Sequence, residues 1–103
     1  MTKGRSAACN RCEDLARIVN GTPACIDGAC LIQLLRADIK PTILGRETRS
    51  PLVLPVFFSI ESREGSSRTL NLGEAVLLQR EVNTVMSVLR QNRIIVTALH
   101  NHW

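Results

Sequence analysis

Apolar residues recur along this chain in two periods, which predict short helices and short strands. The first pattern lies between Asn10 and Asn20, where the apolar positions fall on one side of a short helix. Asn10 or a neighbour can cap its start, and Asn20-Gly21 ends it. The apolar positions of this predicted helix are Leu15, Ala16, Ile18 and Val19.

A β-hairpin is predicted directly after this helix. The segments Pro23–Ile26 and Ala29–Ile32 flank Asp27-Gly28, a dipeptide favoured in two-residue turns whose central positions take positive φ. The second strand can continue to Leu35, and a further strand is expected over Ile39–Leu44.

Alternating apolar residues predict two more strands in the second half of the chain. One covers Val53–Ser62, and the other runs from Leu70 to Leu78 with Glu74 on its apolar face. The first of these strands has Val56, Phe58 and Ile60 on one face and Phe57, Ser59 and Glu61 on the other.

The C-terminal third predicts a helix followed by a last strand. Val82, Val85, Met86 and Leu89 have helical spacing, and Ile94–His100 reads as a buried strand. With the strand that begins at Leu70, they would form a βαβ unit with a right-handed crossover. We therefore predict an α+β fold, with an N-terminal helix, β-hairpins and a C-terminal βαβ unit. One domain is expected over 1–103, with 1–10 as a flexible N-terminus.

Composition narrows the classes of partner. The formal charge is +4, but the basic residues are scattered and the aromatic residues are only Phe57, Phe58 and Trp103, which disfavours nucleic-acid binding. No apolar stretch reaches membrane-spanning length, and no hydrophobic secretory segment follows Met1–Arg5. The expected location is the cytoplasm, and the expected partner is a small molecule or a protein. We find no nucleophile elbow or phosphate-binding glycine loop.

Two histidines near the C-terminus give the strongest hint of chemistry. On a strand, His100 and His102 would point to the same side and offer two ligands to a divalent metal, with zinc as the expected ion. Glu74 could be the third ligand or a general base, and we take it as the candidate catalytic residue. The alternatives are a solvated histidine pair and a buried Glu74 that pairs with an arginine such as Arg46.

Four cysteines form a second candidate metal site: Cys9, Cys12, Cys25 and Cys30. Their C-x2-C and C-x4-C spacings are within the range of structural zinc sites. The predicted hairpin also places Cys25 opposite Cys30, close enough for a disulfide. Free thiols in a reducing cytoplasm are the third alternative.

Several short segments are similar to the LppY/LpqO family, a domain of unknown function. The resemblance covers roughly residues 12–103 and is most specific in the Gly-Glu and His-Asn-His segments. It implies no established activity. Some relatives are exported lipoproteins, and relatives continue past the His-Asn-His segment, so a truncated or remnant domain is one alternative. The matching segments are Gly45-Arg46, Ser50-Pro51, Phe58–Glu61, Leu72–Glu74, Gln79–Asn83 and Val96–Trp103.

The sequence therefore leads to two functional hypotheses. The first is a domain that binds a divalent metal through His100 and His102, with Glu74 assisting. If it is catalytic, metal-assisted hydrolysis is the expected reaction class. The second is a non-catalytic binding or interaction module, in which any zinc is held structurally by the cysteines. Such a module could form a homo-oligomer through an exposed C-terminal strand.

Overall fold

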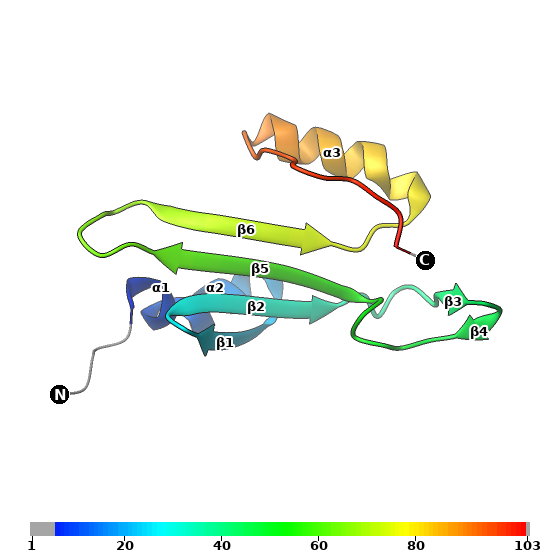
Figure 1. Cartoon of the computed structure of the whole chain (residues 1–103), viewed down its shortest axis with the longest axis horizontal. Coiled ribbons are helices and arrows are strands. Elements are labelled where there is room, and N and C mark those ends of the chain that lie inside the picture. Colours follow the sequence, from blue (N-terminus) through cyan, green and yellow to red (C-terminus); the bar gives the residue numbers. More distant parts are fainter. Residues whose placement is uncertain (1–5, 103) are drawn as a thin grey trace.

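A four-stranded antiparallel sheet organises the protein, which we describe from a computed structural model covering residues 6–102 (Figure 1). The strand order is β1-β2-β5-β6, so each strand pairs with the next one along this main sheet. Helices and an antiparallel sheet in one small unit confirm the predicted α+β class. The strands are β1 Thr22–Ile26, β2 Ala29–Leu35, β5 Pro55–Ser62 and β6 Thr69–Ala75.

The hairpin of β1 and β2 forms as the sequence predicts. Asp27 and Gly28 both have positive φ, at 50° and 83°, which the tight turn requires. The resulting register places Cys25 directly opposite Cys30. The turn dipeptide therefore fixes which cysteines share this part of the sheet.

Two short helices, α1 (Ala7–Asn10) and α2 (Cys12–Val19), lie behind the β1 and β2 side of the sheet (Figure 1). The Ser6 hydroxyl accepts a hydrogen bond from the Cys9 amide and caps α1. The α1 helix occupies part of the segment expected to be flexible, and residues 1–5 lie outside the described range. At the other end, Asn20 takes a left-handed conformation and closes α2, as predicted.

The hydrophobic core is small and is concentrated between these helices and β2. Its buried cluster consists of Ala8, Cys12, Ala16, Cys30 and Ile32, against which Leu15, Phe58 and Ile60 pack. A domain of this size buries little apolar surface and gains from covalent cross-links. Two disulfides, Cys9–Cys25 and Cys12–Cys30, provide them here. They join the helices to both strands of the hairpin.

The region between β2 and β5 differs from the prediction. In place of a strand over Ile39–Leu44, only β3 (Thr42–Ile43) and β4 (Arg46–Glu47) pair, as a separate two-stranded ribbon. The turn between them is Leu44-Gly45, with φ values of 53° and 79°. A reversal at this point leaves the preceding residues without a strand partner.

β6 also ends earlier than predicted, at Ala75 instead of Leu78. The next backbone groups take side-chain partners, because the Val76 carbonyl accepts from Arg36 and the Leu78 amide donates to Glu81. A short 3-10 turn, η1 (Gln79–Glu81), then leads into α3 (Val82–Gln91). The predicted amphipathic helix is thus confirmed.

The last strand of the predicted βαβ unit is wrong, since residues 92–102 contain no strand. Arg93 takes a φ of 61° and the Ile94 amide bonds to the Leu89 carbonyl, so the chain turns back along α3. Within residues 6–102, no backbone hydrogen bond joins the segment after Ile94 to the sheet. We call α3 together with residues 92–102 the C-terminal arm.

The arm gives the molecule an elongated shape. Figure 1 shows α3 beyond the β6 side of the sheet, and no residue of α3 is buried. The radius of gyration is 15.8 Å, whereas about 13 Å is typical of a compact domain of 100 residues. Within residues 6–102, no helix is long and apolar enough to span a membrane.

Candidate functional site

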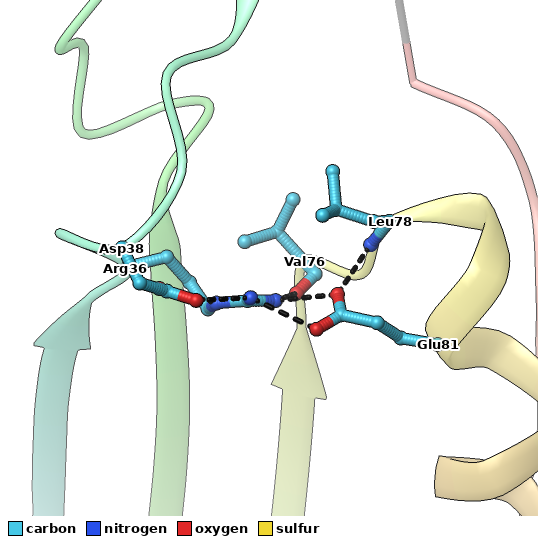
Figure 2. A network of polar contacts seen from close by, with 5 residues as sticks. All are labelled: Arg36, Asp38, Val76, Leu78 and Glu81. Carbon is cyan, nitrogen blue, oxygen red and sulfur yellow. Dashed lines mark hydrogen bonds and ion pairs between the residues drawn. The ribbon is translucent and has the colours of Figure 1, made fainter.

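A network of polar contacts joins the end of β2 to η1, directly before the arm (Figure 2). The Arg36 guanidinium donates to both oxygens of Asp38, at 3.0 and 2.7 Å, and to both oxygens of Glu81, at 2.8 and 3.0 Å. It also donates to the Val76 carbonyl at 3.3 Å. Glu81 in turn accepts from the Leu78 amide at 2.7 Å. We call these residues the arginine clamp.

The contacts in the arginine clamp stabilise the charged forms of Arg36, Asp38 and Glu81. Hydrogen bonds from Arg36 hold the pKa values of the Asp38 and Glu81 carboxyls below their ordinary range. The same two carboxylates raise the pKa of Arg36. Only 14% of the Arg36 side chain is exposed. With its donors already occupied, Arg36 is suited to anchoring η1 to the sheet.

The four cysteines are not arranged as a zinc site. Cys9 is bonded to Cys25, and Cys12 is bonded to Cys30. Structural zinc requires thiolates, and a sulfur atom in a disulfide is not one. The zinc interpretation and the predicted Cys25–Cys30 bridge are therefore both wrong. Cys25 and Cys30 are opposite each other, but each faces a helix cysteine that the sequence analysis did not pair with it.

His100 and His102 do lie close together, with ring centroids 5.0 Å apart. They belong to the extended end of the arm and not to a strand, and both are exposed. Among residues 6–102, no group of three or more His, Cys, Asp or Glu side chains is placed to hold a metal ion. Within this described range, the two histidines lie together without a third ligand.

Glu74 is not placed as a third ligand. It lies on β6, opposite Phe57 of β5, and it is exposed to solvent. The alternative of a buried Glu74 is wrong, because all seven residues of β6 are exposed. In the described part of the chain it makes no ion pair with Arg46 or another residue. The structure gives Glu74 no partner in general acid or base chemistry.

An apolar groove lies on the helix side of the sheet. It has a volume of about 240 Å³ and is bounded by α2 on one side and by β5 and β6 on the other. Ser59 and Asn71 are the only polar residues among those that line it. The groove is lined by Leu15, Ile18, Val19, Ile32, Phe58, Ser59, Ile60, Asn71 and Leu72.

Sequence reasoning missed the arginine clamp and this groove. Glu81 follows Leu78 by three residues, which is the spacing at which an acidic side chain caps a helix start. Ile18 and Val19 extend the apolar side of α2 to the end of the helix. Both signals were present, but neither indicates which distant segment would be the partner.

Comparisons with known proteins give a family but no activity. Searches of curated proteins and of solved structures gave no match. A family model described as Domain of Unknown Function (DUF1259) matches residues 13–103. That range includes α3, the histidine pair and all four strands of the main sheet. The chain therefore belongs to the family of this domain of unknown function.

Proposed function

We propose that this domain is a non-catalytic interaction module that self-associates by strand addition at β6. The added strand would be residues Ile94–Leu99 of a second copy. One observation carries the proposal: among residues 6–102, β6 pairs with β5 on one side and with no strand on the other, and all seven of its residues are exposed. An open strand edge presents unpaired N–H and C=O groups to any extended segment.

The two edges of the main sheet differ in how well they are protected. β1 contains Pro23, which cannot donate a backbone hydrogen bond, and its Cys25 is bonded to Cys9. β6 has no proline or lysine, the residues that commonly block strand addition. Strand addition is therefore favoured at β6.

The arm supplies a segment of suitable chemistry. Ile94–Leu99 is rich in β-branched residues and has no strand partner in the described chain. Ile95 is 85% exposed and Leu99 is 59% exposed. The six-residue segment is similar in length to the seven residues of β6. Pairing would satisfy backbone groups on both segments and bury these apolar side chains.

The test is the mass of the protein in solution, measured by light scattering after gel filtration over a wide range of concentration. We expect a dimer that Val96→Pro abolishes, because proline removes a donor from the added strand. Asn101→Pro is the matched control, since it changes the same arm outside the pairing segment. A monomer at every concentration, or a dimer that survives Val96→Pro, would contradict the proposal.

A second candidate function is divalent metal binding by His100 and His102. The 5.0 Å separation of their rings supports it, because two nearby imidazoles can share one ion. We expect weak zinc binding in calorimetry that the His100→Ala, His102→Ala double variant loses. Equal zinc binding by the double variant and the unmodified protein would exclude the two histidines as the metal site. Catalysis by Glu74 gains no support from its position.

The closer resemblance to LppY/LpqO domains is a proposal within the established family. The Gly73-Glu74 and His100-Asn101-His102 segments support it. A solved structure of an LppY/LpqO domain should then show the strand order β1-β2-β5-β6. A different strand order in that structure would contradict the resemblance.

We also propose that the protein works in an oxidising environment, although the sequence analysis favoured the cytoplasm. The two disulfides support this, because such bonds persist mainly outside reducing compartments. We expect protein isolated under thiol-blocking conditions to contain no reactive thiol by mass spectrometry. If all four cysteines of protein from its native source were found as blocked thiols, they would be reduced there. That result would contradict this proposal and favour the cytoplasm.

A further inference from the structure

The two disulfides lie on the same face of the hairpin but differ in their exposure to solvent. In the Cys12–Cys30 bond both cysteines are buried, at 2% and 0% exposed. In the other bond Cys9 is 2% exposed, whereas Cys25 lies on the edge strand β1, all of whose residues are exposed. We infer that Cys9–Cys25 is a thiol–disulfide exchange site, which accepts two electrons from a dithiol through attack at the Cys25 sulfur. This chemistry is separate from self-association and does not depend on it.

Exposure decides which sulfur atom an external thiol attacks. Exchange begins when a thiolate bonds to one sulfur of a disulfide and the other sulfur leaves as a thiolate. Cys25 offers the exposed side of the bond, and Cys9 is covered by the protein. The new bond therefore forms at Cys25, and Cys9 is the leaving group. Because burial disfavours a charged thiolate, Cys9 takes up a proton and remains as a thiol, which packs like a small apolar side chain.

Net reduction requires a partner with two thiols. With a single thiol, Cys9 lies beside the mixed disulfide and can attack it, which restores the Cys9–Cys25 bond and releases the thiol. With a dithiol, the second thiolate of the partner attacks the partner's own sulfur in the mixed disulfide. Cys25 then leaves and takes up a proton. The partner is oxidised to a disulfide, and the domain is reduced to one thiol at Cys9 and one at Cys25.

The fold has the means to survive this opening. Cys12–Cys30 still joins α2 to β2 inside the core cluster. The Ala8 amide donates to the Ser62 hydroxyl at 3.2 Å, which ties α1 to β5 independently of the cysteines. The strand β1 keeps its whole pairing with β2. Cys9–Cys25 can therefore open and close while the rest of the domain remains folded, as a reversible exchange site requires.

The first test is the order in which the two bonds of the unmodified protein are reduced. Protein treated with dithiothreitol for increasing times is quenched with a thiol-blocking reagent, and mass spectrometry of its peptides locates the blocked cysteines. We expect Cys9–Cys25 to open at least roughly tenfold faster than Cys12–Cys30, with the circular dichroism spectrum retained after the first step. Simultaneous opening of both bonds, or earlier opening of Cys12–Cys30, would overturn the inference.

Two serine variants test which sulfur is attacked. Cys9→Ser leaves an exposed thiol at Cys25, and Cys25→Ser leaves a buried thiol at Cys9, although both variants lose the same disulfide. We expect Cys9→Ser to form a mixed disulfide with glutathione disulfide at least roughly tenfold faster than Cys25→Ser. Peptide mapping checks that Cys12–Cys30 is intact in both variants before the rates are compared. Equal rates, or a faster reaction of Cys25→Ser, would overturn the assignment of Cys25 as the attacked sulfur. The order of reduction decides the inference even if a variant does not fold.

Discussion

The two ends of this protein are stabilised by different means. The N-terminal segment, residues 6–35, has two disulfides, a capped helix and the buried cluster around Cys12, Cys30 and Ile32. The C-terminal arm contributes no buried residue from α3 and is joined to the sheet through the arginine clamp. The N-terminal segment is therefore the more stable part of the fold, and the arm is the less stable part.

The largest expected effect comes from the Cys12–Cys30 disulfide of the N-terminal segment. Replacing Cys12 and Cys30 together with alanine should lower the free energy of unfolding by about 2–5 kcal/mol, since the denatured chain gains freedom and the core loses contacts. Chemical denaturation measures the change. The control is the Cys9→Ala, Cys25→Ala variant, because Cys25 is exposed and Cys9, although buried, lies outside the core cluster. If this control loses as much stability, the core contribution of the buried disulfide is refuted.

Substitution of Gly21 in the N-terminal segment gives the next largest expected effect. A Cβ at Gly21 would lie 2.6 Å from Ile32 Cγ2 and 3.1 Å from the Gln33 carbonyl oxygen, too close for either to stay in place. Gly21→Ala should therefore cost about 1–3 kcal/mol in thermal unfolding. Gly73→Ala is the matched control on β6, where the nearest atom is Phe58 Cδ1 at 3.4 Å. Equal losses from the two variants would contradict this explanation.

Loss of the arginine clamp should destabilise the arm and leave the stability of the rest of the fold unchanged. Arg36→Ala removes both carboxylate contacts, so amides of α3 should exchange with solvent roughly tenfold faster, whereas those of β2 and β5 keep their protection. Hydrogen exchange followed by mass spectrometry resolves the two regions. Arg17→Ala is the control, because that arginine makes an exposed pair with Asp14. Unchanged exchange in α3 would show that the clamp does not hold the arm.

The smallest effect is a dependence of the clamp on pH. Because the folded pKa values of Asp38 and Glu81 lie below those of the unfolded chain, their contribution is fully present above the unfolded values of about 4. It is lost as the pH falls through the lower folded values. Exchange of α3 should therefore quicken in strong acid, after correction for the intrinsic rate, and Arg36→Ala should remove this dependence. The same acid response in that variant would contradict it.

The local features of the fold could be predicted from the sequence. Asp27-Gly28 determines the hairpin and its register, Asn20 ends α2, and the spacing from Val82 to Leu89 makes α3. Each depends on residues adjacent or a few positions apart, where steric and hydrogen-bonding preferences act directly. The candidate site was predicted less well from the sequence. The two histidines lie close together as expected, but Glu74 does not lie with them.

The sequence by itself determined the class of the fold, the hairpin and the amphipathic helix. It also supplied four cysteines that can cross-link a domain with a small core. Only the tertiary structure decided that Cys9 bonds to Cys25 and Cys12 to Cys30, that Arg36 meets Glu81, and that Ile94–Leu99 remains outside the sheet. These pairings join residues far apart in the chain. Their free energies depend on burial and on competing partners, which local spacing does not encode.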